Sequence, residues 1–341
     1  MEAPSIDLSS AISFDNKVAG HDGVLQDASG SVIIKPASIY EIEFYQQLAA
    51  SHPAFAKLAP QFYGTLELSE QQTQEDSKAC DSATNSSLTH KIKDAERAIV
   101  LENATAGFSK PSVIDIKLGR QLWDSRASAE KAARLDAVAA ETTSGSLGFR
   151  IAGMKVWDPL KDEFVTYDKL YGRKFTKDNI LEGFQNFFPE ALGSERRTEI
   201  IKRILSVIDE MARVLEAEES KMYSASILIV YEGDITAFDE ALVYEKMASA
   251  AEEESESEEE VELVGETIQV DGKVVERISF AGSNIPAYNN EIAEDDEEIE
   301  KFVCKVKIID FAHATWVPGQ GRDTNMLEGI YNTRKIFEKL L

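Results

Sequence analysis

The hydrophobic pattern of the chain alternates between short apolar runs and longer amphipathic stretches, so it predicts both strands and helices. A hairpin is expected where residues 23–26 and 31–35 flank the turn at 27–30. Short apolar or β-branched runs predict further strands at residues 98–102, 113–118, 149–156, 163–167, 226–231 and 303–311. Amphipathic or alanine-rich stretches predict helices at residues 39–50, 127–140, 179–188, 195–216 and 326–341. This mixture predicts the α+β class.

Two polar stretches interrupt the pattern and are predicted to be insertions. Residues 69–94 are rich in Gln, Ser, Thr and Asp, with little to bury. Residues 249–300 begin and end with acidic runs, whose like charges repel and keep a chain extended. Between these runs, residues 267–280 alternate around an Asp-Gly pair and predict a second hairpin. We expect residues 69–94 to be flexible and residues 249–300 to be largely disordered.

The length and the charge of the chain indicate how it is divided and which ligands it could bind. The chain has 341 residues, which suggests two domains or lobes, and carries 61 acidic against 36 basic residues, a net charge of -25. Residues 245–300 hold 19 acidic and 3 basic residues, so this segment accounts for -16 and the rest of the chain for -9. Such acidity argues against direct nucleic acid binding, which needs a basic face. It leaves room for a small polyanion in a local basic pocket.

Cysteine content and hydropathy indicate the compartment. Cys80 and Cys304 are the only cysteines, too few for a disulfide framework, so a reducing compartment is expected. The first 16 residues lack the pattern of a signal peptide. The longest apolar run, near residues 227–231, is far shorter than the roughly 20 residues that span a bilayer. We expect a soluble intracellular protein without a transmembrane segment.

The Walker A, dinucleotide-binding, GxSxG, HExxH, HRD and DFG motifs are absent from the sequence. The candidate site residues are instead charged residues next to the predicted strands, and the first of them lies in the first hairpin. Lys35 closes the hairpin after a glycine-bearing turn, like the phosphate-binding lysine of a kinase small lobe. Glu41 follows on the next predicted helix and could pair with Lys35. Alternatively, Lys35 is a solvated strand-end lysine. Glu41 also reads as the second member of a capping box that starts at Ser38.

Three further strands carry polar residues of interest. Asp115 and Lys117 are two apart in a predicted strand and share a face, which indicates either a buried ion pair or a site. Asp310 lies near the end of an apolar strand, where a carboxylate could bind Mg²⁺ or cap the following turn. Residues 99–104 run from a strand into a linker. They could form a hinge that offers backbone groups to adenine, or an ordinary strand exit.

A specific family resemblance rests on three of these segments. The pattern PxxxDxKxG at residues 111–119, IDFAH at 309–313 and the strand Ser-Ile-Leu at 226–228 resemble the inositol polyphosphate kinase family. Further similarity to its fungal multikinases lies at residues 20–23, 41–45, 107–111, 145–154 and 171–173, and the acidic insertion is itself typical of them. The resemblance covers nearly all of the chain except residues 69–94 and 249–300. Ala225 departs from the family, which usually has a second serine there.

The resemblance implies a two-lobed kinase-like fold with an ATP cleft between an N-lobe (residues 1–105) and a C-lobe (106–341). It implies a small helical insertion at residues 120–145 that binds the inositol phosphate, with ATP and Mg²⁺ as cofactors. Lys35, Lys117 and Asp310 would be catalytic, and Asp310 would hold the metal. The cofactor would be bound by Lys35, Glu41, the backbone of Glu102 and Ala104, Asp115 and Asp310. The substrate would be bound by Lys117, Lys131, Arg134, Lys169 and His313.

The residues after Gly119 support a polyanionic substrate. Arg120, Arg126, Lys131 and Arg134 form a basic stretch in an acidic chain, and the last two share a helical face. A solvated helix face is the alternative for that pair.

The resemblance implies an ATP-dependent multikinase. It would phosphorylate hydroxyls of inositol 1,4,5-trisphosphate and inositol tetrakisphosphate stepwise, giving inositol pentakisphosphate. One alternative is an inositol hexakisphosphate kinase, which shares the core motifs but fits residues 145–154 less well. Another is a mainly non-catalytic nuclear scaffold that binds basic proteins through its acidic segment. Fungal relatives are associated with transcription regulation, so both roles could coexist. We expect a monomer in nucleus and cytoplasm.

Overall fold

The computed structural model describes residues 12–14, 18, 23–67, 97–258, 265–270, 273–278 and 300–341. The chain divides into two compact units, the larger formed by Met1–Phe238 with Phe302–Leu341 and the smaller by Asp239–Lys301. The insertion predicted at residues 69–94 lies outside the described residues. Among the helices that are described, none is long and apolar enough to cross a membrane.

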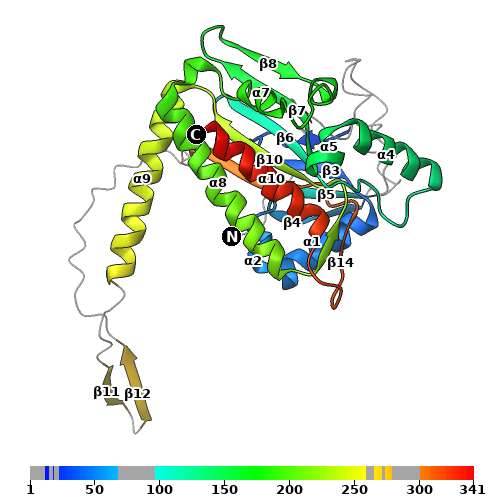
Figure 1. The fold of residues 1–341 in the computed structure, drawn as a ribbon. Helices are drawn as coiled ribbons and strands as arrows, with labels where there is room; N and C mark the ends of the chain where they lie inside the picture. Colours follow the sequence, from blue (N-terminus) through cyan, green and yellow to red (C-terminus); the bar gives the residue numbers. More distant parts are fainter. Residues whose placement is uncertain are drawn as a thin grey trace, which may run out of the picture. The chain divides into compact units, whose positions relative to one another are not determined.

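The first sheet of the larger unit has five antiparallel strands (Figure 1). Leu25 pairs with Ile34, so the hairpin predicted between residues 23 and 35 is confirmed. The side chain of Asp27 accepts a hydrogen bond from Val32 N at 3.1 Å, and Gly30 takes a left-handed φ of 73° that a turn residue with a side chain rarely adopts. The strand order is β1 (Ile12–Ser13), β2 (Leu25–Gln26), β3 (Val32–Pro36), β5 (Arg97–Glu102) and β4 (Phe62–Glu67).

Helix α1 (Ile39–Ser51) connects this sheet to the C-terminal part of the chain, and the short helix α2 (Pro53–Ala56) follows it. Ser38 caps α1 by accepting a hydrogen bond from Glu41 N at 3.3 Å, which is one half of the predicted capping box, while the Glu41 side chain binds Lys35. Phe44 of α1 stacks on Phe311, with 4.7 Å between the ring centroids. This stacking places the helix against the residue that follows Asp310.

The second sheet contains the strands of the PxxxDxKxG and IDFAH segments. Its central strand β6 (Pro111–Leu118) is almost wholly buried, and its antiparallel partner β10 (Ser226–Glu232) aligns Ser226 with Lys117 and Leu228 with Asp115. The remaining strands are β13 (Cys304–Ile309) beside β10, β7 (Phe149–Asp158) beside β6, and β8 (Glu163–Tyr167) at the edge. Helix α10 (Thr324–Leu340) contacts β6 and β7, and α8 (Ser194–Ala217) lies against α10 (Figure 1).

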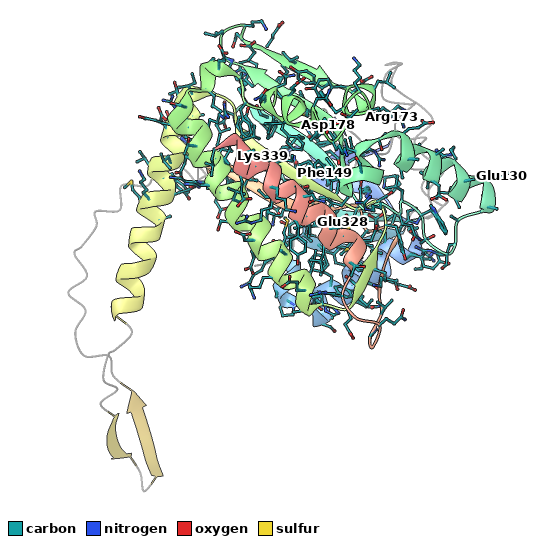
Figure 2. The ribbon with its side chains drawn as sticks, viewed as in Figure 1. Glu130, Phe149, Arg173, Asp178, Glu328 and Lys339 are labelled. Atoms are coloured by element: carbon teal, nitrogen blue, oxygen red, sulfur yellow. The ribbon has the colours of Figure 1, made fainter. Side chains whose placement is uncertain are left out.

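Helix α4 (Ala129–Glu141) begins two residues later than predicted, because Ser128 is its cap and accepts a hydrogen bond from Lys131 N at 3.2 Å. Only Ala139 of this helix is buried, and Figure 2 shows Glu130 at the end farthest from the rest of the unit. Trp123 Nε1 donates to Asp136 at 2.6 Å and ties the helix to the preceding loop. The remaining short elements are α5 (Thr143–Leu147), α6 (Lys169–Gly172), α7 (Ile180–Gln185), η3 (Glu190–Leu192), and the pair β9 (Ser220–Met222) and β14 (Ala314–Trp316).

The smaller unit contains most of α9 (Ile235–Glu258) and the hairpin of β11 (Gly265–Val270) and β12 (Lys273–Ile278). Val270 pairs with Lys273, so the second predicted hairpin is confirmed. The disorder predicted from residue 249 differs from the structure at residues 249–258, which continue α9, and at the two strands. The other residues of 259–299 lie outside the described residues, and their disorder stays a prediction. The α+β class is confirmed, whereas the lobe boundary between residues 105 and 106 also stays a prediction.

Sequence reasoning missed strand β4. Gly64 interrupts the alternation of this strand with a φ of 149°, and the register with β5 shifts between Phe62 and Gly64. The strand is thus held by its pairing with β5 more than by its own pattern.

Candidate active site

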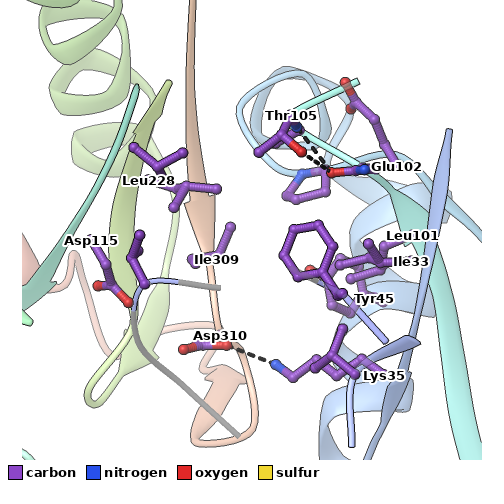
Figure 3. A pocket seen from close by; sticks show the side chains of 17 residues that line it. Ile33, Lys35, Tyr45, Leu101, Glu102, Thr105, Asp115, Leu228, Ile309 and Asp310 are labelled. Atoms are coloured by element: carbon purple, nitrogen blue, oxygen red, sulfur yellow. Dashed lines mark hydrogen bonds and ion pairs between the residues drawn. The ribbon is translucent and has the colours of Figure 1, made fainter. Parts of the chain in front are cut away.

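Lys35 lies at the centre of a buried charge cluster. Its Nζ is 2.8 Å from Glu41 Oε1 and 2.7 Å from Asp310 Oδ1 (Figure 3 shows the second contact). Lys35 is 7% exposed and Glu41 is 2% exposed. Burial acts to lower the pKa of Lys35, but the Asp310 and Glu41 carboxylates outweigh it and raise the pKa. The solvated strand-end alternative for Lys35 is therefore wrong, and the side chain is a fixed cation.

Asp310 stands between two lysines at the end of β13. Its Oδ1 binds Lys35, and its Oδ2 is 3.9 Å from Lys117 Nζ. Lys117 is itself held by Ser224 O, which accepts from its Nζ at 2.7 Å. Asp310 has a left-handed φ of 68°, a conformation that costs roughly 1–3 kcal/mol and persists where the surroundings enforce it. The backbone turn after β13 thus directs this carboxylate toward both lysines.

Asp115 borders the same cluster from strand β6. It is 3% exposed, and its Oδ1 has no hydrogen-bond partner among the residues described. Burial raises the pKa of Asp115, with Lys117 opposing this effect and Asp310 adding to it. A buried carboxylate oxygen without a partner is costly, so its persistence beside a cleft indicates a place for a ligand donor.

A cleft of about 800 Å³, partly open to solvent, runs from this cluster to the linker after β5. Figure 3 shows Lys35 and Asp310 at one end and Glu102 and Thr105 at the other. The walls between the two ends are apolar and include Val18, Val24, Ile33, Leu101, Val113, Leu228 and Ile309.

The linker end is rigidly built. Glu102 N donates to Gln61 O at 2.9 Å, so this hinge donor is already engaged within the protein. The side chain of Asn103 donates to Gly30 O at 2.6 Å and accepts from Thr105 N at 3.0 Å. Glu102 and Ala104 both line the cleft, and the contact with adenine that the resemblance implies for them stays a prediction.

The side chain of Glu102 faces the lysines of β13. Burial acts to raise its pKa, but Lys307 and Lys305 outweigh this effect and lower it. The Glu102 carboxylate lies 3.4 Å from Lys307 Nζ and 3.5 Å from Lys305 Nζ. These contacts fasten the hinge to the second sheet.

The predicted substrate residues are not all brought together. Lys117 contacts Asp310, and His313 lies three residues after Asp310, where its Nδ1 is 3.0 Å from Asp124 Oδ2. Lys131 and Arg134 lie on α4 and Lys169 on α6, and none of these three side chains pairs with another described residue. Their substrate contacts stay predictions.

Two cations of the basic stretch are neutralised within the protein. Arg120 Nε donates to Glu328 at 2.6 Å, and its Nη2 donates to the same carboxylate at 2.5 Å. Arg126 donates through Nε to Asp124 at 2.6 Å. The stretch therefore offers Lys131 and Arg134, and not all four charges, to an anion.

Sequence reasoning missed Arg150 of β7, which pairs in register with Lys117. Burial lowers the pKa of Arg150 to about 10, with Arg173 acting in the same direction and Asp115 against it. Arg150 Nη1 donates to Ser144 at 2.8 Å. Its signal in the sequence was an arginine inside the apolar run at 149–156. It adds a second, partly desolvated cation beside Lys117.

A divalent cation fits the cluster through Asp310. The side chain of Asp310 is 24% exposed and borders the cleft, and carboxylate oxygen is the donor that Mg²⁺ prefers. No group of three or more metal-ligating side chains occurs in the described part of the chain. Such a site matches an ion held by one or two carboxylates together with nucleotide phosphates and water.

Comparison with known proteins gives the family. The inositol polyphosphate kinase family matches residues 98–338. An inositol polyphosphate multikinase of Saccharomyces cerevisiae is 30% identical over 95% of this chain and 97% of its own. One of Schizosaccharomyces pombe is 33% identical over 64% of this chain and 78% of its own. Inositol hexakisphosphate kinases of mouse and human match over only 40% of this chain.

A solved structure resembles the whole fold. The crystal structure of an inositol phosphate multikinase from S. cerevisiae in complex with ADP and Mn²⁺ superimposes with a TM-score of 0.60 at 29% identity. The match covers 91% of this chain and 99% of the other. By the match over residues 98–338 and the 30% identity over 95% of its length, the chain belongs to the inositol polyphosphate kinase family.

Proposed function

We propose that this protein is an ATP-dependent inositol polyphosphate multikinase. It transfers the γ-phosphate stepwise to hydroxyls of inositol 1,4,5-trisphosphate and inositol tetrakisphosphate, giving inositol pentakisphosphate. The observation that carries the proposal is the placement of Asp310 between Lys35 and Lys117 at the polar end of the cleft. Phosphoryl transfer depends chiefly on positioning and on neutralising charge, and this cluster supplies both.

ATP would bind in the cleft in one direction. Adenine would lie between the apolar walls, against the backbone of Glu102 and Ala104, where the Glu102 carbonyl is the expected acceptor because its N–H is engaged. The unpartnered Oδ1 of Asp115 would accept from the ribose hydroxyls. Lys35, oriented by Glu41, would bind the phosphates, and Asp310 would hold Mg²⁺, which neutralises phosphate charge when bound.

The inositol phosphate would lie on the far side of Asp310 from the cleft. Lys117 would contact both the transferred phosphate and the substrate, since it faces Asp310 Oδ2. The other phosphates of the inositol phosphate would be bound by Lys131, Arg134 and Lys169, and His313 would lie at the attacking hydroxyl. Arg150, in register with Lys117, would add positive charge there.

The test is turnover of labelled ATP with inositol 1,4,5-trisphosphate by the wild type and by Asp310→Ala. We expect stepwise products from the wild type and almost none from the variant. Inactivity of the wild type on all inositol tris- to hexakisphosphates would contradict the proposal. Pyrophosphate products from the hexakisphosphate, without products from the trisphosphate, would favour the hexakisphosphate kinase alternative.

A second role is proposed for the acidic segment, residues 249–300, on the basis of its charge. This segment would bind basic nuclear proteins and so serve an accessory role in transcription regulation. The protein would be a monomer and would occur in both nucleus and cytoplasm. Deletion of residues 249–300 should retain turnover and abolish partner binding. Retained binding of the partner would contradict this role. Fluorescence microscopy would check the compartment, and sedimentation analysis would check that the protein is a monomer.

A further inference from the structure

A buried carboxylate fixes the ring of His313. Asp124 is 189 residues away in the sequence, yet its Oδ2 lies 3.0 Å from His313 Nδ1. The Asp124 side chain is 8% exposed, whereas that of His313 is 34% exposed. His313 also lines a cavity together with Tyr40, Lys221 and Tyr223. One ring nitrogen is therefore held inside the protein while the ring borders open space.

Asp124 is ionised and can only accept hydrogen bonds. Its Oδ1 accepts from Arg126 N at 3.0 Å, and its Oδ2 accepts from Arg126 Nε at 2.6 Å and also from Arg126 Nη2. Burial acts to raise the pKa of Asp124, but the hydrogen bonds from Arg126 and His313 outweigh it and lower the pKa. An ionised carboxylate has no proton to donate.

This charge state selects the proton position on His313. Because Asp124 only accepts, the ring donates through Nδ1. In the neutral ring Nε2 then carries the lone pair and is available as an acceptor. The carboxylate thus determines both the orientation and the tautomer of His313.

The loop of Asp124 is anchored on two sides. Arg126 Nη2 donates to Ala312 O at 3.3 Å, one residue before His313. The Arg126 guanidinium also lies over the ring of Tyr40 in α1, 3.9 Å from its centroid. The helix that supplies Glu41 to the lysine cluster therefore supports the Asp124–His313 pair as well.

The backbone of His313 is likewise coupled to Lys117. Tyr223 N donates to His313 O at 3.2 Å, and Ser224 O accepts from Lys117 Nζ at 2.7 Å. Two consecutive residues thus hold His313 and Lys117 in a fixed relation. Since Lys117 faces Asp310, the His313 ring is held relative to the charge cluster.

We propose that Asp124 is a positioning residue for phosphoryl transfer, which holds His313 so that Nε2 accepts a hydrogen bond from the attacking inositol hydroxyl. This rests on the proposed function, because His313 meets such a hydroxyl only if the substrate binds there. A merely structural Asp124 would affect stability and leave the tautomer of His313 unchanged.

The first test is spectroscopic and needs no substrate. The full chain has four histidines, so nitrogen-15 NMR can resolve them, and His313→Gln assigns the relevant ring by loss of its signals. We expect the Nδ1–H form in the wild type. In Asp124→Asn the side-chain amide has one acceptor oxygen, whereas the carboxylate has two. We therefore expect the Nε2–H form of the His313 ring to appear in this variant. An unchanged tautomer in that variant would overturn the proposal.

The second test is kinetic, with inositol 1,4,5-trisphosphate and ATP. Asp124→Asn should lower kcat by about tenfold to hundredfold, by analogy with the loss when the partner that orients a metal-ligating histidine is removed, with little change in KM for ATP. The double variant with His313→Gln should be no slower than His313→Gln alone. Fully additive losses would overturn the proposal, because the two residues would then act independently.

A matched control is Glu328→Gln, which also removes a carboxylate paired with an arginine of the same segment. It should leave both the His313 tautomer and kcat unchanged. Full activity in His313→Gln would overturn the role of His313 and this inference, while the multikinase proposal would stand. Wild-type inactivity on inositol phosphates would instead overturn the proposed function, and the NMR result would still decide whether Asp124 orients His313.

Discussion

The Lys35 ammonium and the Asp310 carboxylate lie 2.7 Å apart, although 275 residues separate them in the sequence. Each stands at the end of a strand, one in each five-stranded sheet. Glu41 supports Lys35 from one side, and Lys117 approaches Asp310 from the other. The cluster therefore joins the two sheets and shapes the polar end of the cleft.

Lys35→Met should cost both stability and activity. The change leaves Glu41 buried without its cation, and breaking a buried pair in this way typically costs about 3–5 kcal/mol. Chemical denaturation measures the loss in the free energy of unfolding, and ATP turnover should fall to near background. As a control, Lys161→Met removes an exposed lysine paired with Asp158 and should change neither quantity appreciably. Equal stability of the two variants would contradict the buried-cluster description.

Substitutions at Asp310 should separate backbone strain from charge. Asp310→Ala, Asp310→Asn and Asp310→Gly all remove the carboxylate, so all should be inactive. Because φ is 68°, the glycine variant should be more stable than the alanine variant by about 1 kcal/mol, with asparagine between them. Thermal unfolding of the three variants gives the order, and an alanine variant as stable as the glycine variant would show that this conformation carries no strain.

Asp115 should make stability depend on pH. Its pKa is raised in the folded protein, so the folded state holds a proton that the unfolded state has released. This group therefore lowers stability as the pH rises from the unfolded value of about 4 through the higher folded value. Asp115→Asn should gain stability relative to the wild type across that rise. Denaturation series at several pH values measure this difference, and a constant difference would contradict the prediction.

Gly153 should be needed for the close approach of the Val18 backbone, which lines the cleft. A Cβ at this position would lie 2.2 Å from Val18 O, and Val18 is a wall of the cleft. Gly153→Ala must therefore displace the Val18 backbone, and we expect a several-fold weaker affinity for ATP. Calorimetric titration with a non-hydrolysable ATP analogue measures the affinity. Gly319→Ala is a control, because a Cβ there meets nothing within 4 Å and its φ of 82° strains an alanine away from the cleft. It should lose some stability but bind ATP normally, and equal binding by both variants would contradict this role.

The sequence was sufficient for the residues whose motifs are local. Lys35, Asp115 and Asp310 were singled out because each ends or occupies an apolar strand, but that pattern left other readings open and their roles followed only from the family resemblance. The partners that neutralise the basic stretch were not found, because Glu328 is 208 residues from Arg120 and no local pattern links them. Asp124 was missed for the same reason, since its histidine is brought to it by the fold.

The most direct test of the central claim is the product profile over time from inositol 1,4,5-trisphosphate, ATP and Mg²⁺. We expect successive appearance of inositol tetrakisphosphate and inositol pentakisphosphate in the wild type. With Asp310→Ala we expect neither product, although that variant remains folded. Undiminished product formation by Asp310→Ala, or none by the wild type, would contradict this claim.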